Sequence, residues 1–355
     1  MSSAPLPTSA LATAWPRVRS LGVVAALIVL VAVVAIAQPG FLAPGNLMNV
    51  LSQWAPVAVM GVGMTYVVIT GGFDLSVGAT YALCAVVAAA LGQTQAPAVA
   101  FAVAMLVGLA VGAVNWLIVT ALRVNAFIAT LGSSLILGGI ALVITGNRPF
   151  IVEFADFGVL GSGRIAGIPY SGLLAIAVMI VGGLVLAYTP YGQSVYAVGG
   201  NLEASRLAGI RTSGVVASSY ALSGLCAGIG GVISASRLSS AQASMSSDLV
   251  FDVLTVVIVG GTLLSGGKGA VWRTAVGVAI LATLQNGFNL LDINPYYQDI
   301  IKGLIIIAAL ASVRLPRRIR PAAVRPTDAD AADSDAAPAT PTSVPVPATT
   351  ERGAL

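Results

Sequence analysis

One acidic residue, Asp74, lies between two long apolar runs, in the stretch 70–78 (TGGFDLSVG). If those runs cross a membrane, an acid at this depth costs about 2.5–3.5 kcal/mol even on lenient scales, so Asp74 needs polar partners. Gly71 and Gly72 permit unusual backbone angles, and Asp74 followed by Ser76 can cap the next helix. Two compatible interpretations follow: the acid fixes a break between helices, or it lines a polar pathway or touches a substrate.

A second polar stretch, 199–210 (GGNLEASRLAGI), has the features of a short capped helix. Asn201 is a natural N-cap, Arg206 and Gly209 follow at helical spacing, and Gly209 is a natural stop. The segment, which also contains Glu203, is too short and polar to span a membrane. It is either an ordinary interfacial helix or a docking helix for a cytoplasmic partner, and these residues alone do not decide between the two.

A third stretch, 260–269 (GGTLLSGGKG), superficially resembles a phosphate-binding loop. That loop needs Gly, four residues, and then Gly-Lys-Ser/Thr. Thr262 stands where the first Gly is required, and Gly269 stands where Ser or Thr is required, so nucleotide binding is rejected. The stretch is predicted to be a turn between two helices, anchored by Lys268 and Arg273. If ATP drives this protein, another subunit must bind it.

The other polar groups in the apolar runs are mostly neutral. Each is more often a contact between helices than a ligand contact, but together they suit an uncharged, hydroxyl-rich solute, and Asn286 and Asn289 are candidates for its pathway. The sequence shows no proton-relay chain, catalytic dyad or metal-ligand cluster, and Cys84 and Cys226 fit buried apolar positions, so neither an enzyme nor a bound cofactor is indicated. The polar set is Gln53, Asn115, Thr130, Thr255, Gln285, Asn286, Asn289, Gln298 and Lys302.

The elements that carry these residues are helices of a membrane protein. Of 355 residues, 57% are apolar and 8% charged, whereas soluble domains have about 25% charged residues. An all-α transmembrane bundle of about 10 spans (8–10) is predicted, because three of the apolar segments (77–92, 251–264 and 298–313) fall short of the roughly 20 residues that a spanning helix needs. The ten segments are 21–37, 50–69, 77–92, 97–121, 126–145, 171–188, 215–235, 251–264, 274–291 and 298–313.

Charge distribution predicts the orientation. With the N-terminus in the cytoplasm, 13 of the 17 Lys and Arg residues fall inside, 3 outside (Arg148, Arg164 and Arg237) and 1 within a span, as the positive-inside rule requires. Both termini are then cytoplasmic, in a bacterial inner or plasma membrane. The first run lacks a small-x-small cleavage site and is expected to be an uncleaved span rather than a signal peptide.

The expected domains are a short tail, a membrane domain and a second tail. Residues 1–20 form a cytoplasmic N-terminal tail, 21–313 the transmembrane domain, and 314–355 a basic and then disordered cytoplasmic tail. The C-terminal tail combines Pro, Ala, Thr and scattered Asp without apolar periodicity, so it cannot bury enough surface to fold. Its first arginines are expected to lie against anionic lipid headgroups. No basic cluster interleaved with aromatics suggests nucleic-acid binding.

Four of these stretches resemble, in order, signature regions of the ribose-type ABC sugar permeases: 61–78, 125–132, 199–210 and 260–269. The matches extend across about residues 42–313. The resemblance implies the permease subunit of an ATP-binding-cassette importer, without enzymatic activity of its own, that translocates a monosaccharide such as ribose or xylose. Gln193 and Val250 depart from the family pattern, where Arg and Glu are common, and leave the particular sugar open.

The same resemblance implies partners. An ATP-binding subunit would hold the ATP and dock on the inner helix, with Asn201, Glu203, Arg206 and Gly209 as docking candidates. An extracytoplasmic sugar-binding protein would deliver the sugar, and a second permease copy, as a homodimer, would complete the pore. Two other hypotheses remain. An ion-coupled secondary transporter would use Asp74 and Lys302 as coupling charges, and a membrane scaffold or receptor would bind partners without flux.

Overall fold

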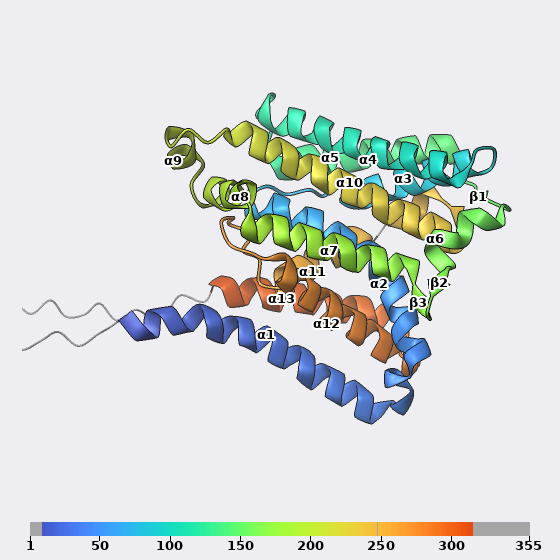
Figure 1. The fold of residues 1–355 in the computed structure, drawn as a ribbon, viewed down its shortest axis with the longest axis horizontal. Coiled ribbons are helices and arrows are strands. Elements are labelled where there is room, and N and C mark those ends of the chain that lie inside the picture. Colours follow the sequence, from blue (N-terminus) through green and yellow to red (C-terminus); the bar gives the residue numbers. More distant parts are fainter. Residues whose placement is uncertain (1–8, 247, 315–355) are drawn as a thin grey trace, which may run out of the picture. The chain divides into compact units, whose positions relative to one another are not determined.

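The computed structural model describes residues 9–246 and 248–314, and within them a helix covers all or most of each of the ten predicted ranges (Figure 1). Residues 1–8 and 315–355, which include most of the predicted C-terminal tail, lie outside the described part. The first helix begins at Ser9, upstream of the predicted start at 21. The ten helices are α1 (Ser9–Ala37), α2 (Pro44–Ile69), α3 (Val77–Gly92), α4 (Pro97–Thr120), α5 (Ala126–Thr145), α7 (Tyr170–Tyr188), α10 (Thr212–Leu238), α11 (Leu249–Val259), α12 (Val271–Leu290) and α13 (Pro295–Arg314).

The connections between these helices gather at two ends, the α6 end and the α9 end (Figure 1). At the α6 end, β1 pairs antiparallel with β4, and β2 with β3. At the α9 end lie α8, α9 and the turn 260–270. The short elements are η1 (Pro39–Leu42), β1 (Phe150–Ile151), η2 (Ala155–Gly158), α6 (Val159–Ser162), β2 (Arg164–Ile165), β3 (Ile168–Pro169), α8 (Pro190–Gly200), α9 (Leu202–Leu207), β4 (Ser240–Ala241) and η3 (Ala243–Ser246).

Helices α2 and α10 form the interior of the bundle. In the most apolar window of α2, 94% of the residues are buried, and in α10 the share is 61%. The corresponding shares for α4, α5 and α7 are only 22%, 28% and 22%, although these three helices are more hydrophobic. Apolar helices whose side chains remain exposed are expected where lipid, not water, surrounds the protein. The all-α membrane fold is therefore confirmed.

Glycine allows α10 to pack very closely on α4. A Cβ atom on Gly112 would overlap the carbonyl oxygen of Tyr220, and one on Gly224 would overlap the carbonyl oxygen of Gly108. Gly108 and Gly112 are four residues apart on α4, as are Gly224 and Gly228 on α10, which is the small-xxx-small spacing of tightly packed membrane helices. This packing brings polar side chains of the two helices to the same depth in the interior.

Two of the helices are too short to cross a bilayer. At 1.5 Å per residue, the 16 residues of α3 extend about 24 Å and the 11 residues of α11 about 16 Å, against a hydrocarbon core of about 30 Å. The predicted shortness of 77–92 and 251–264 is confirmed, whereas 298–313 belongs to a helix of 20 residues. In the described residues, five helices are long and apolar enough to span: α2, α4, α5, α7 and α10. The total of about ten spans remains a prediction.

Candidate functional site

The break between α2 and α3 is organised around the buried carboxylate of Asp74, which is 2% exposed. Its Oδ1 accepts hydrogen bonds from the Ser76 hydroxyl (2.6 Å) and the Ser76 backbone N–H (3.1 Å). Its Oδ2 accepts one from the Ser223 hydroxyl on α10 (2.6 Å). The side chain that receives an N–H at the start of α3 is therefore Asp74, while Ser76 makes no capping bond of its own.

Three further side chains connect this break to the surrounding helices. The Asn115 side-chain amide on α4 donates to the Ser76 hydroxyl (2.7 Å), and the backbone N–H of Leu75 donates to the Thr130 hydroxyl on α5 (3.0 Å). The Tyr220 hydroxyl on α10 donates to the carbonyl oxygen of Phe73 (2.9 Å). The break is thus fixed by α4, α5 and α10 together, a network that stabilises one backbone path through the apolar interior.

The Asp74 carboxylate has hydroxyl and backbone partners but no cation. Within the described residues, no Lys or Arg lies at salt-bridge distance from it. Charge-assisted bonds to several donors are the remaining way to keep a buried carboxylate stable. The Asn115 carbonyl oxygen, Oδ1, is buried nearby in the same network without a partner. The arrangement has the properties of a structural anchor, and the described residues include no cluster of His, Cys, Asp and Glu that could hold a metal ion.

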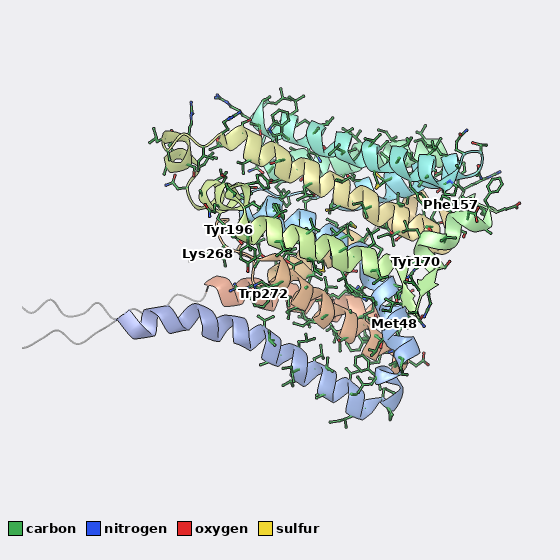
Figure 2. The ribbon with its side chains drawn as sticks, viewed as in Figure 1. Met48, Phe157, Tyr170, Tyr196, Lys268 and Trp272 are labelled. Carbon is green, nitrogen blue, oxygen red and sulfur yellow. The ribbon has the colours of Figure 1, made fainter. Side chains whose placement is uncertain are left out.

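Three glycine-containing segments meet just beyond this break, at the α9 end. The Gly267 N–H donates to the carbonyl oxygen of Ile69, the last residue of α2 (2.8 Å). A Cβ atom on Gly199, near the end of α8, would overlap that same carbonyl oxygen and lie 2.6 Å from the Gly267 nitrogen. The Tyr196 hydroxyl donates to the carbonyl oxygen of Gly269 (2.8 Å), and Figure 2 shows Tyr196 beside Lys268 on this turn. We call this contact of Ile69, Gly199 and Gly267 the glycine junction.

The predicted docking helix is present as α9 and is capped as expected. The Asn201 side chain accepts a hydrogen bond from the backbone N–H of Ala204 (2.9 Å), and Gly209 ends the helix with a φ of +82°. Glu203 and Arg206 are exposed, and so is Leu207, at 83%. Gly199 lies at the end of α8, and α9 begins three residues later. The glycine junction therefore connects this exposed helix to the last residue of α2 and to the turn 260–270.

The other predicted pathway residues lie away from Asp74. The amides of Asn286 and Asn46 bond to each other reciprocally (2.8 and 3.0 Å), where α12 meets the first turn of α2 at the α6 end. Asn289 accepts from the Gln298 amide (3.1 Å). The structure therefore does not bring Asn286 and Asn289 together with the Asp74 network.

Lys302, paired with Asp74 in the ion-coupled hypothesis, has a different partner. Its ammonium lies 3.1 Å from Asp252 on α11 and 3.9 Å from Asp299. Lys302 and Asp252 are largely covered, at 19% and 15% exposed side chain. The pair joins α11 to α13, and within the described residues no contact joins Lys302 to Asp74.

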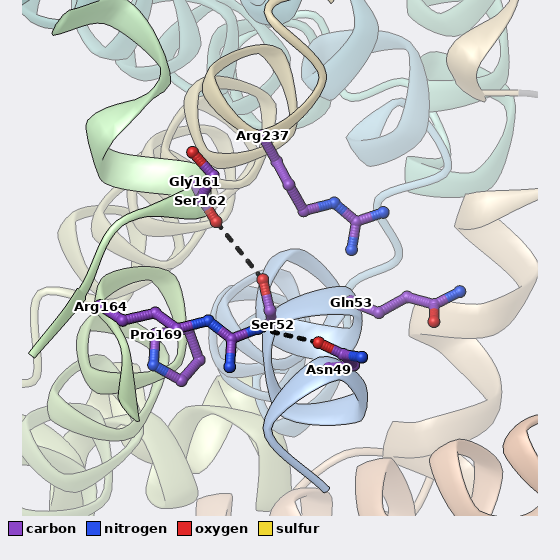
Figure 3. A pocket seen from close by; sticks show the side chains of 8 residues that line it. All are labelled: Asn49, Ser52, Gln53, Gly161, Ser162, Arg164, Pro169 and Arg237. Atoms are coloured by element: carbon purple, nitrogen blue, oxygen red, sulfur yellow. Dashed lines mark hydrogen bonds between the residues drawn. The ribbon is translucent and has the colours of Figure 1, made fainter. Parts of the chain in front are cut away.

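A cavity of about 260 Å³ opens at the α6 end, between α2, α6 and the last turn of α10 (Figure 3). It carries two arginines, Arg164 and Arg237. The Arg164 guanidinium donates to the Asn49 side chain (2.9 Å), whereas no hydrogen bond or ion pair holds the Arg237 guanidinium within the described residues. The lining is Asn49, Ser52, Gln53, Gly161, Ser162, Arg164, Pro169 and Arg237.

Sequence reasoning missed this cavity and the distant members of the Asp74 network, although it paired Asp74 with Ser76. Ser223, Tyr220 and Asn115 are ordinary residues in apolar helices, and nothing in their spacing relates them to position 74. The paired Gly-x-x-x-Gly spacings in 108–112 and 224–228 could have indicated that α4 and α10 pack together. The two arginines could have been noticed as two of only three cations on the predicted outer side.

Comparison with known proteins identifies the family. Residues 46–310 match the family described as branched-chain amino acid transport system / permease component. The chain is 41% identical over 290 residues to the ribose import permease protein RbsC of Escherichia coli K12, covering 80% of this chain and 90% of that protein. It is 37% identical over 295 residues to RbsC of Bacillus subtilis 168, covering 82% and 92%.

A third relative transports a different sugar by name. The galactose/methyl galactoside import permease protein MglC of Escherichia coli K12 is 34% identical over 313 residues, covering 82% of this chain and 92% of that protein. No solved structure matches the chain. A match to the family over most of the chain, with relatives of this identity and coverage, shows that the protein belongs to the ABC importer permease family that includes the ribose permeases, as a transport subunit and not an enzyme.

Proposed function

We propose that this chain imports a monosaccharide of the ribose class through the bacterial inner membrane, powered by a separate ATP-binding subunit. The observation that carries the proposal is the 41% identity to a ribose import permease over 290 residues, with 34% to a galactoside permease. The largely neutral Asn, Ser, Thr and Gln groups of the helices suit a hydroxyl-rich solute. The description of the matched family also names branched-chain amino acids, so these belong in the test.

The α9 end is assigned to the cytoplasm. Within the described residues it carries Arg123, Arg206, Arg211, Lys268 and Arg273, and the positive-inside rule favours this side. On this assignment residues 1–20 and 314–355 are cytoplasmic tails, 21–313 is the membrane domain, and the ten helices cross or enter the bilayer. The C-terminal arginines lie near the anionic lipid surface.

The helix α9 is assigned as the docking surface for the ATP-binding subunit. Its exposed side chains, Leu202, Glu203, Arg206 and Leu207, combine charge with uncovered apolar surface outside the spans. Such a mixed patch is typical of a protein interface. Asn201 and Gly209 would fix its two ends, and the glycine junction would pass its movement to the membrane helices.

The remaining predicted residues have supporting roles in this proposal. Asp74, Ser76, Gly71 and Gly72 form the break in which α2 reverses into α3, and they keep that break rigid while neighbouring helices move. The amides of Asn286 and Asn289 are candidate sugar contacts near the α6 end, available when their present amide partners separate. A second copy of the chain completes the pore, and an extracytoplasmic binding protein delivers the sugar.

The test is uptake in proteoliposomes that contain the permease, its ATP-binding subunit and its sugar-binding protein. We expect ATP-dependent uptake of radiolabelled D-ribose, with D-xylose, D-galactose and L-leucine as competitors that define the specificity. Liposomes loaded with a non-hydrolysable ATP analogue are the control. Preference for leucine would contradict the sugar assignment. Uptake by the permease alone, abolished by an uncoupler, would favour the ion-coupled alternative.

A further inference from the structure

The cavity at the α6 end is built so that two guanidinium groups face a common space (Figure 3). Arg164 follows α6 and is held by Asn49 at 2.9 Å. Arg237 lies in the last turn of α10, where α6 packs against it so closely that a Cβ atom on Gly161 would overlap its backbone nitrogen. The Gly161 N–H also donates a hydrogen bond to the Ser236 hydroxyl oxygen (2.9 Å). Packed backbone therefore fixes the point where the Arg237 side chain leaves α10, and the Asn49 side chain holds the Arg164 guanidinium.

The cavity has positive charge and no acid to balance it. Its other polar groups are the amides of Asn49 and Gln53 and the hydroxyls of Ser52 and Ser162, and no Asp or Glu lines it. Within the described residues, no carboxylate lies within salt-bridge distance of Arg164 or Arg237. Guanidinium groups bind carboxylates in a planar, bidentate geometry. The natural complement of this cavity is therefore a carboxylate and not a neutral sugar.

The surroundings indicate that the carboxylate comes from a protein. The segment 146–170, which contributes α6 and β2 to the cavity, exposes four large apolar side chains: Ile151 (61%), Phe154 (57%), Val159 (50%) and Ile165 (55%). Uncovered apolar groups beside a charged centre are typical of protein interfaces. The cavity, at about 260 Å³, is also smaller than the roughly 300–1,000 Å³ of most small-molecule sites. Glu153 and Asp156 of this segment do not line it.

We propose that Arg164 and Arg237 form a socket for an acidic side chain of the extracytoplasmic sugar-binding protein, with the exposed apolar residues of 146–170 as its rim. The proposal rests on the proposed function, because it requires the α6 end to face outward and a binding protein to deliver the sugar. It adds the site and the chemistry of that docking. A carboxylate that enters the socket exchanges water for two guanidinium groups, of which that of Arg164 is already held by the Asn49 side chain.

The test measures the affinity of the sugar-loaded binding protein for the permease–ATPase complex in lipid nanodiscs, at low and high salt. The variants are Arg164→Glu and Arg237→Glu, with Arg148→Glu as a matched control. Arg148 is an exposed arginine of the same end that does not line the cavity. We expect each socket variant to weaken binding at least about tenfold and to reduce its salt dependence, while Arg148→Glu binds as the wild type does.

Controls separate the possible failures. If a Glu variant does not assemble with the ATP-binding subunit, Arg164→Gln and Arg237→Gln replace it, with the same expected direction. Socket variants that bind like Arg148→Glu would overturn the proposal while leaving the importer intact. Saturable, arginine-dependent binding of acetate or phosphate, with unchanged affinity for the binding protein, would overturn it in favour of a small-anion site. A wild-type complex that binds no binding protein would refute the proposed function itself.

Discussion

Gly199 and Gly267 meet backbone to backbone, with no side chain between them. A Cβ atom on Gly199 would lie 2.6 Å from the Gly267 nitrogen, and that nitrogen donates to the Ile69 carbonyl oxygen at 2.8 Å. The end of α8, the end of α2 and the turn before α12 are therefore in direct backbone contact. Because close-packed atoms transmit displacement with little loss, we expect a force applied to α9 to reach α2 and the turn before α12 through this contact.

Gly199→Ala is expected to abolish ATP-dependent sugar uptake. The new methyl group would overlap the Ile69 carbonyl oxygen, so α8 must shift away from α2. Gly200→Ala is the matched control, since a Cβ atom there meets nothing within 4 Å. Uptake in proteoliposomes and thermal unfolding of the purified complex are the measurements. Equal uptake by the two variants would show that the glycine junction does not couple α9 to the membrane helices.

Asp74→Ala is expected to destabilise the protein by about 1–3 kcal/mol, because the hydroxyls of Ser76 and Ser223 lose their buried acceptor. Asp74→Asn should be less destabilising than Asp74→Ala. The amide keeps one acceptor oxygen, but its NH₂ group replaces the second oxygen that accepts a hydroxyl hydrogen bond in the wild type. Unfolding in detergent, monitored by fluorescence, gives the shift. Asp299→Asn, at an exposed carboxylate, is the control. A double-mutant cycle with Ser223→Ala should show coupling, and strict additivity would argue against a shared network.

Changing both Glu203 and Arg206 to Ala is expected to weaken docking of the ATP-binding subunit while leaving membrane insertion intact. Asn201→Ala should loosen the same helix by about 1 kcal/mol through the lost N-cap. Arg123→Ala, an exposed arginine of the same end outside α9, is the control. A pull-down from solubilised membranes reports the association. Undiminished recovery of the ATP-binding subunit with the Glu203/Arg206 double variant would contradict the assignment.

The pair of Lys302 and Asp252 distinguishes ATP-driven import from ion coupling. Since their 3.1 Å contact joins α11 to α13, reversing both charges, as Lys302→Asp with Asp252→Lys, should preserve the pair and restore much of the ATP-driven uptake that either single change loses. An ion-coupling role would depend on which helix carries which charge. Continued loss of uptake in a double variant that still assembles would count against a purely structural pair.

The helices could be predicted because a long apolar run indicates a helix buried in lipid or protein, and this does not depend on which side chains it contacts. The range 77–92 agrees with α3 at both ends. The range 251–264 was too long, because Gly260 and Gly261 end α11 although the apolar residues continue to Leu264. The range 298–313 was too short at its start, because α13 begins at Pro295, before its apolar run, and proline suits the first turn of a helix.

The candidate site could be predicted only where a residue type was unusual for its surroundings or where the pattern was local in sequence. An acid in an apolar run is conspicuous, so Asp74 was identified, and the capping pattern of α9 is local in sequence. Besides the neighbouring Ser76, the residues that complete the Asp74 network are common polar residues separated from it by long stretches of chain, and tertiary packing alone brings them together. The glycine junction was not predicted either, because glycine pairs in loops usually serve turns and reveal no partner.

The distance in sequence between Asp74 and Ser223, 149 residues, also affects how the chain is made. At about 5–20 residues per second, roughly 7–30 s of synthesis separate the two. During that time α2 and α3 enter the membrane with a carboxylate that lacks one of its final donors. We therefore expect the nascent α2–α3 pair to remain beside the insertion machinery, or near water, until α10 is synthesised. Shortened nascent chains that stop before α10 should accordingly be favoured clients of membrane chaperones and quality-control proteases.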